Sequence, residues 1–299
     1  MKAVWSLWTK PLSRERPSGW WASDKQHWLS WILSVETARR HYPETWLYTD
    51  DLGARILVDG LGLPFTHVST ELNALADHDP GWWALGKIYT YHLQTGPFVH
   101  LDSDVFLWKR LPPHLEQADV LAQSPEYFIP GASCYRPECF EQTLQNATSG
   151  WLPEEWMWYR RMYWPQRAES CGILGGTHTD FIRYYADCSL RLIEHPANQY
   201  GWRHFEDKLG NMILIEQYLL SACIEYHKAD PRSPFAGVGI QYLFNTPDDL
   251  FNPDCAAQVG YTHLIADAKR DPVLAQRLEL RVQRDYPDLY ERCLRLTEG

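Results

Sequence analysis

The sequence has no cysteine pair at the C-x-x-C spacing, no long apolar run and no excess of positive charge. Its seven cysteines are scattered and odd in number, which disfavours both a structural zinc site and a disulfide framework. The apolar runs are too short for a bilayer span or a signal peptide. The net charge of −10 argues against a nucleic-acid partner, because binding the phosphate backbone needs a basic stripe. We therefore expect a cytoplasmic protein without a membrane segment or nucleic-acid partner.

The composition that remains is that of a globular enzyme-sized chain. Its 299 residues, 45% of them hydrophobic and 22% charged, are enough for one large domain with a sizeable core. Tryptophan is unusually frequent, with 15 residues, and tyrosine adds 17 more. Aromatic faces stack on sugar rings, although core packing is the default explanation for any one tryptophan.

Strand and helix signals alternate through the first hundred residues. Strands are predicted at 2–9, 45–49, 65–69 and 98–101, and helices at 24–41, 52–62 and 82–95. The helix at 24–41 is expected to start from a cap at Asp24. This order predicts an α/β fold with a mostly parallel sheet and helices on both faces.

The second half is less regular. Short strands are predicted at 119–123 and 171–174, and helices at 178–192, 207–227 and 272–296. Residues 128–168, rich in tryptophan and tyrosine, are interpreted as an insertion covering one end of the sheet. With no repeat or linker in view, we expect a single domain over residues 1–299 with an embellished C-terminal half.

Asp102 and Asp104 are the residues that the sequence predicts to bind a metal ion. They follow the apolar strand at 98–101, and ligands of parallel sheets bind at the carboxyl ends of the strands. Two carboxylates one residue apart on an extended chain point the same way. Such a pair suits Mg²⁺ or Mn²⁺ with open positions for a diphosphate, although a solvated turn is the alternative for an isolated D-x-D.

Residues 85–89 and 98–104 together resemble the core of GT-A-fold glycosyltransferases. The resemblance is closest to the retaining group that includes glycogenin-like enzymes and bacterial lipopolysaccharide galactosyltransferases. It implies a GT-A-like, Rossmann-like domain. A nucleotide-binding half would lie at 1–110, and a donor-sugar and acceptor half at 111–299.

The resemblance also implies residues that bind the nucleotide-sugar. Lys87 stands where the family has a basic residue that contacts the donor, and Ser103 lies within the D-x-D motif. Residues 170–176 resemble the family's Asn-Ser-Gly-Val segment, which implies that Gly175 and Gly176 lie beside the donor. A turn is the plain alternative for two adjacent glycines.

Later segments extend the resemblance. Glu216 and Gln217 resemble an Asp-Gln pair that faces the sugar, and the apolar residues around Glu216 make an unpaired carboxylate costly there. His263 and Lys269-Arg270 resemble a terminal H-x-x-G-x-K motif, in which histidine is the third metal ligand and lysine holds the diphosphate. A buried, hydrogen-bonded histidine and solvated charges are the alternatives.

Three positions depart from the family pattern. Ser170 replaces an asparagine and Glu216 an aspartate, which bears on the choice of donor sugar. Ala266 stands near the place of the motif glycine, which bears on His263.

These features predict a glycosyltransferase that depends on Mn²⁺ or Mg²⁺ and uses a UDP-sugar donor. The resemblance implies retention, and the acceptor is left open among a glycan, a peptide and a natural product. One rival is a haloacid-dehalogenase-type phosphatase with Asp102 as nucleophile; another is a non-catalytic nucleotide-sugar-binding module.

Overall fold

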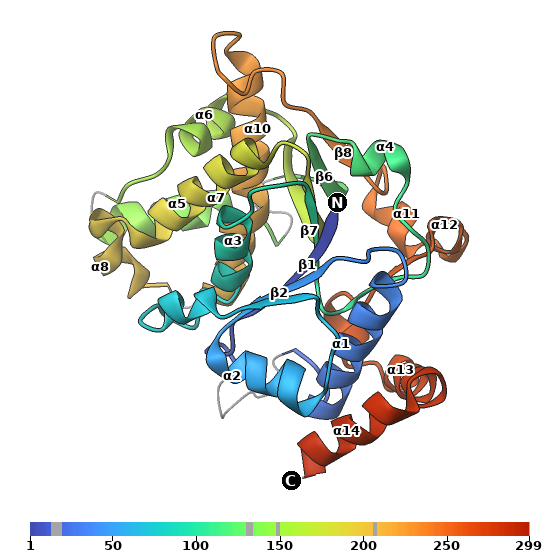
Figure 1. The fold of residues 1–299 in the computed structure, drawn as a ribbon. Helices are drawn as coiled ribbons and strands as arrows, with labels where there is room; N and C mark the ends of the chain where they lie inside the picture. The colour runs from blue at the N-terminus through green and yellow to red at the C-terminus, as the bar shows by residue number, and fades with distance from the viewer. Residues whose placement is uncertain (13–19, 130–133, 148–149, 206–207, 299) are drawn as a thin grey trace. The chain divides into compact units, whose positions relative to one another are not determined.

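The computed structural model describes residues 1–12, 20–129, 134–147, 150–205 and 208–298. The chain divides into two compact units. Unit 1 contains Met1–Pro80, Phe98–Pro112 and Leu250–Gly299, and unit 2 contains Gly81–Pro97 and Pro113–Asp249. The predicted α/β class is confirmed, since parallel strands alternate with helices along the first part of the chain (Figure 1).

Unit 1 contains four parallel strands in the order β3-β2-β1-β4. Their bounds are β1 Lys2–Leu7, β2 Thr45–Thr49, β3 His67–Ser69 and β4 Phe98–Leu101. The central β1 pairs with both β2 and β4, and all four residues of β4 are buried. A strand buried on both faces needs an apolar run, which is the pattern that Phe98–Leu101 supplies.

Three long helices of unit 1 pack together: α1 (Asp24–Ala38), α13 (Pro272–Asp285) and α14 (Pro287–Glu298). Both α13 and α14 lie beside α1 (Figure 1). The cap of α1 is Ser23, whose hydroxyl accepts from the Gln26 amide, so the predicted Asp24 cap is wrong by one residue. The predicted helix at 272–296 is two helices, because Pro287 begins a new one.

Shorter elements complete unit 1. Strand β5 (Val105–Leu107) pairs with β9 (Tyr261–His263) in a separate antiparallel ladder. The remaining elements are α2 (Asp51–Ala54), a π-helical turn (Arg55–Gly60), 3-10 turns at Glu71–Leu75 and Ala266–Lys269, and α12 (Pro253–Val259). Helix α11 (Pro247–Phe251) contains the point in the chain where one unit ends and the other begins.

Unit 2 contains three strands in the order β7-β6-β8. Strand β6 (Val120–Phe128) runs antiparallel to β7 (Gln166–Gly176) and parallel to β8 (Ile240–Tyr242). Strands β6 and β7 are longer than the strands predicted at 119–123 and 171–174. Buried polar residues that do not look like strand interior in the sequence, such as Ser124, Gln166 and Glu169, extend them. The segment 128–168 supplies the end of β6, helices α5 (Pro137–Ala147) and α6 (Glu154–Met162), and the start of β7. Its residues 130–133 and 148–149 lie outside the described residues.

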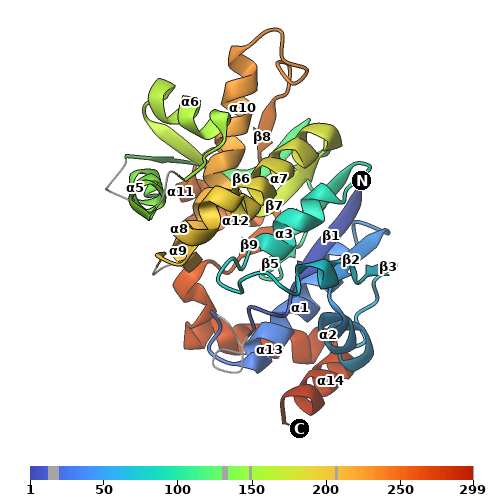
Figure 2. The ribbon, with the colours of Figure 1, turned by 90° about the vertical axis from the view of Figure 1, so that its left-hand side faces the viewer.

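Helices of unit 2 pack in pairs. Helix α3 (Leu85–His92) lies beside α7 (Thr179–Glu194), as Figure 2 shows, and α6 packs on α10 (Leu219–Ala229). The predicted helix at 207–227 contains a π-helical segment, Leu214–Tyr218, between α9 (Lys208–Ile213) and α10. The other elements are α4 (Pro113–Glu116), α8 (Gln199–Trp202) and a 3-10 turn at Pro196–Asn198.

Tryptophan serves mainly as core. Eight of the 15 tryptophans are buried, whereas only Trp20 and Trp164 are exposed. The enrichment therefore reflects packing at most positions. Among the described residues, no helix combines the length and the apolar character that crossing a membrane requires.

Candidate functional site

The two aspartates predicted to bind a metal lie at the carboxyl end of β4, in the connection to β5. The Val105 amide donates to the Asp102 carbonyl oxygen at 3.0 Å, which closes a turn over Ser103 and Asp104. From α1, the Ser34 hydroxyl donates to the same carbonyl oxygen at 3.2 Å. The turn is thus held from two sides, and it fixes the backbone from which both carboxylates project.

The β5–β9 ladder brings His263 to these aspartates. Val105 is the register partner of His263, and the Leu264 amide donates to the Asp104 carbonyl oxygen at 3.1 Å. His263 Nε2 consequently lies 3.4 Å from Asp104 Oδ1. One ligand atom from each of Asp102, Asp104 and His263 lies within 4.8 Å of the others.

This donor set fits a divalent cation. Two carboxylates and an imidazole are ligands that Mn²⁺ accepts, and carboxylates also suit Mg²⁺. Ligands at about 2.1 Å from one ion lie up to about 4.2 Å apart, so small side-chain rotations would bring the three atoms onto it. Ligation itself stays a prediction.

Lys269 lies at the same carboxylate. It ends the 3-10 turn Ala266–Lys269, and its Nζ lies 2.6 Å from Asp104 Oδ2. Burial would raise the pKa of Asp104, but the charges of Lys269 and His263 outweigh it and hold that pKa far below its ordinary value. The buried Asp104 carboxylate is therefore an anion held between the Lys269 ammonium and the His263 imidazole.

Ala266 has the backbone conformation of a glycine. Its φ of 49° makes it the only non-glycine residue with positive φ in the described part of the chain. It lies three residues after His263, at the place of the glycine in the H-x-x-G-x-K motif that this segment resembles. The chain thus makes the left-handed turn between His263 and Lys269 despite the substitution, at the cost of some strain.

One aromatic ring, that of Trp21, lies near Lys269, and the sequence did not indicate this neighbour. Lys269 Nζ lies 5.8 Å from the Trp21 ring centroid, and Trp21 stacks on His27, which stacks on Trp28. Burial, and then the charge of Lys269, lowers the pKa of His27 to about 3. The neutral ring accepts a hydrogen bond from Trp31 Nε1 at 3.2 Å.

His100 is a second residue near the aspartates that the sequence did not single out. It lies on β4, and its Nδ1 is 3.8 Å from Asp102 Oδ1. Its Nε2 lies 2.9 Å from the Ser6 hydroxyl on β1. The only sequence signal was its position two residues before Asp102 in a run that is otherwise apolar.

Two further predicted residues, Lys87 and Glu216, meet inside unit 2. Lys87 Nζ lies 2.7 Å from Glu216 Oε1 and donates to the Cys171 carbonyl oxygen at 2.7 Å. Glu216 lies in the π-helical segment, is 0% exposed, and its carbonyl oxygen accepts from the Tyr185 hydroxyl. The apolar residues around Glu216 indicated that its carboxylate needs a partner, and the Lys87 ammonium is such a partner.

The remaining predicted residues of unit 2 lie on β7 and the π-helical segment. Gln217 is partly exposed and receives a hydrogen bond from the Tyr135 hydroxyl. Gly175 and Gly176 end β7, and a Cβ on Gly176 would lie 2.1 Å from the Asp119 carbonyl oxygen. Packing against the backbone before β6 is thus sufficient to require glycine at 176.

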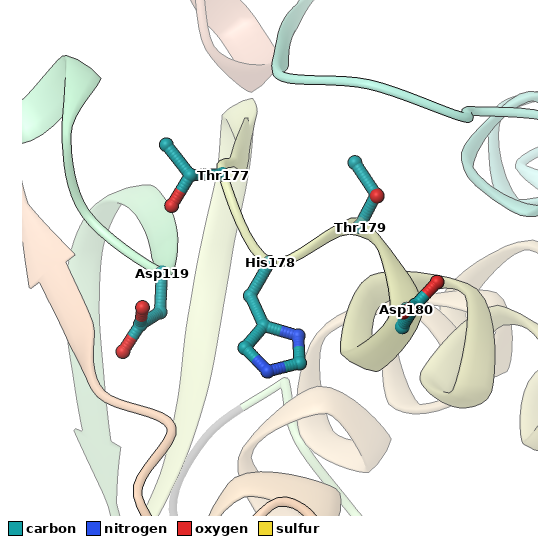
Figure 3. A pocket seen from close by; sticks show the side chains of 5 residues that line it. All are labelled: Asp119, Thr177, His178, Thr179 and Asp180. Carbon is teal, nitrogen blue, oxygen red and sulfur yellow. The ribbon is translucent and has the colours of Figure 1, made fainter.

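A shallow hollow of unit 2 lies at the start of α7 (Figure 3). It is lined by Asp119, Thr177, His178, Thr179 and Asp180. His178 caps α7, and Asp119 accepts from the Gly239 amide at 3.1 Å. Two carboxylates and no lysine or arginine in the lining make this hollow unsuited to a diphosphate.

Comparison with protein families assigns the chain to one of them. The model of a family of unknown function, DUF6734, matches residues 1–296. The chain belongs to this family. A search of curated proteins found no match to its sequence.

Solved structures of one enzyme are similar to this DUF6734 protein. Galactosyltransferase LgtC, in complex with donor and acceptor sugar analogues, is 12% identical with a TM-score of 0.49. The match covers 97% of this chain and 95% of that one. An active-site mutant of LgtC is 11% identical with a TM-score of 0.41, covering 93% and 96%. Because these values are low, the function is inferred from the residues of the site.

Proposed function

We propose that this DUF6734 protein is a metal-dependent glycosyltransferase. It would transfer a sugar, with retention, from a UDP-sugar to a hydroxyl of a glycan, peptide or natural product. The observation that carries the proposal is the convergence of Asp102, Asp104, His263 and Lys269 at the carboxyl end of β4. Two anionic ligands beside an imidazole and an ammonium suit an ion together with the diphosphate it neutralises.

In this proposal the site residues of unit 1 bind the leaving group. Asp102, Asp104 and His263 would hold Mn²⁺ or Mg²⁺, and such an ion would supply positive charge to the oxygens of the nucleoside diphosphate. Lys269 adds a second positive charge for the same oxygens. Ser103 lies between the two aspartates in the turn and is proposed to contact the same diphosphate.

For unit 2 taken by itself, the candidate residues are proposed to contact a sugar. Gln217, which is partly exposed, can hydrogen-bond to a sugar hydroxyl with its amide. Glu216 is fully buried against Lys87, which supports a positioning role for this ion pair beneath Gln217. Gly175 and Gly176 would allow the backbone to approach the donor closely.

The phosphatase alternative is not favoured. The D-x-D motif of such phosphatases usually follows the first strand of the domain, whereas Asp102 follows the fourth strand, β4, after several strand–helix units. The non-catalytic alternative predicts donor binding without turnover, which the assay below separates.

A panel of nucleotide sugars tests the function. We expect slow release of nucleoside diphosphate from one donor with Mn²⁺, lost with EDTA and in the Asp104→Asn variant. The matched control is Asp187→Asn, since that carboxylate pairs with His92 on the surface.

Circular dichroism would show whether each variant is folded. Unchanged release by folded Asp104→Asn, or by wild type in EDTA, would contradict the proposal. Donor binding without release, with sugar, peptide and natural-product acceptors present, would favour the non-catalytic module.

A further inference from the structure

Lys269 and a divalent cation would both contact the Asp104 carboxylate. The Lys269 ammonium contacts Asp104 Oδ2 at 2.6 Å, while Asp104 Oδ1 faces His263 Nε2 at 3.4 Å. Asp104 is 3% exposed, so water screens the charges around it poorly. A cation placed between Asp102, Asp104 and His263 therefore meets the positive charge of Lys269 within a few ångströms.

We propose that Lys269 opposes binding of the divalent cation at Asp104, and that the diphosphate of the donor removes this opposition. Metal and nucleoside diphosphate then bind with positive coupling, and Lys269 is the residue that couples them. This inference rests on the proposed function, because it takes the metal and the diphosphate from it.

The surroundings of Lys269 allow its side chain to turn while its backbone stays fixed. Its carbonyl oxygen accepts from the Ala22 amide at 3.3 Å, and the Arg270 guanidinium donates to the Trp20 carbonyl oxygen at 3.2 Å. These bonds tie the end of the 3-10 turn to residues 20–22. The Trp21 ring, 5.8 Å from Nζ, offers the ammonium a second favourable contact when it leaves Asp104.

The sign of the coupling follows from charge. A diphosphate attracts the ammonium, which weakens its hold on Asp104 and offsets its repulsion of the metal. By linkage, the factor by which the diphosphate tightens metal binding equals the factor by which the metal tightens diphosphate binding. We expect a factor of about ten or more, as for charges a few ångströms apart in a poorly screened site.

The test measures Mn²⁺ affinity without any turnover. Free Mn²⁺ is followed by electron paramagnetic resonance during titration of wild type, Lys269→Met, Lys269→Arg and Lys109→Met, each with and without UDP, with correction for Mn²⁺ bound by free UDP. Lys109 is a matched control, because its exposed ammonium donates to the Ala257 and Gln258 carbonyl oxygens and contacts no carboxylate within the described part of the chain.

We expect Lys269→Met to bind Mn²⁺ about tenfold more tightly than wild type without UDP, and to lose most of the tightening that UDP produces in wild type. Lys269→Arg keeps the charge and should keep the coupling, and Lys109→Met should match wild type. Unchanged or weaker Mn²⁺ binding by folded Lys269→Met overturns the inference, whereas the proposed function then still stands on its own assay.

Two further outcomes also decide. If neither wild type nor Lys269→Met binds Mn²⁺, both the inference and the metal site of the proposed function fail. If Lys269→Met does not fold, Lys269→Gln replaces it, and wild type alone is sufficient to refute the coupling when UDP leaves its Mn²⁺ affinity unchanged.

Discussion

The Lys87–Glu216 pair gives a prediction that separates its structural from its functional role. Both side chains are almost fully buried, at 7% and 1% exposed, and their charged atoms lie 2.7 Å apart. Removing one member of such a pair takes away the opposite charge that stabilises the other charged group in the protein interior. We therefore expect Lys87→Met and Glu216→Gln each to destabilise the protein strongly.

The magnitude is bounded by the cost of neutralising the group left behind. Breaking a buried ion pair costs about 3–5 kcal/mol. For Lys87→Met the ceiling at pH 7 is about 4 kcal/mol, because a glutamate can instead take up a proton at that cost. The double variant removes both charges, so its loss of unfolding free energy should be smaller than the sum of the single losses by about 2 kcal/mol or more.

The assay is urea unfolding of wild type, the two single variants and the double variant. Lys25→Met is the control, because Lys25 pairs with Glu279 at 2.8 Å but both side chains are more exposed, at 32% and 25%. Its cost should stay below about 1 kcal/mol. Additive single losses, or a Lys87→Met cost no larger than that of the control, would refute a buried, coupled pair. Activity of a stable double variant then reports on function separately.

Two other predictions concern unit 1. Because burial and then Lys269 lower the pKa of His27 to about 3, the unfolded chain takes up a proton as the pH falls below about 6.5 and the folded chain does not. His27 should thus lower the unfolding free energy by roughly 1.4 kcal/mol per pH unit as the pH falls from 6 to 4. The His27→Gln variant should lose this contribution, and the same pH dependence of unfolding free energy in wild type and variant would contradict the prediction. Ala266→Gly should relieve the positive φ and raise the unfolding free energy by up to about 1 kcal/mol in urea unfolding. The helical control Ala275→Gly should lower it by about 1 kcal/mol, and an equal loss in both variants would contradict the strain.

Much of the parallel sheet could be predicted because its signals are local. The strands predicted at 45–49 and 98–101 match β2 and β4 in their bounds. An aspartate follows each strand, and the Gly96-Pro97 breaker precedes β4, so the sequence marks these boundaries. Strand β7 was predicted only at 171–174, because Arg167 and Glu169 look like surface residues in sequence. In the structure they form an ion pair at 2.8 Å, and this pairing permits their burial.

The candidate site was only partly predictable. The order of Asp102 and Asp104 after an apolar strand is visible in the sequence, but their approach to His263 depends on the β5–β9 ladder, which joins segments about 160 residues apart. The aromatic neighbours of Lys269 were not predictable. Trp21 and His27 carry no local signal, since their role arises only when residues 20–28 lie against the turn that ends at Lys269.

The two aspartates of the motif are chemically unequal despite their spacing. Asp104 is 5% exposed in its side chain and is held by Lys269 and His263, whereas the Asp102 side chain is 27% exposed. The difference follows from the chain, because Asp104 precedes β5 and joins the ladder through Leu264, while Asp102 lies at the start of the turn. Asp104 is therefore held by Lys269 and His263 in the protein alone, and under the proposed function the more open Asp102 would contact an incoming ion first. The same proposal predicts that the site favours an ion that binds together with an anion able to attract Lys269.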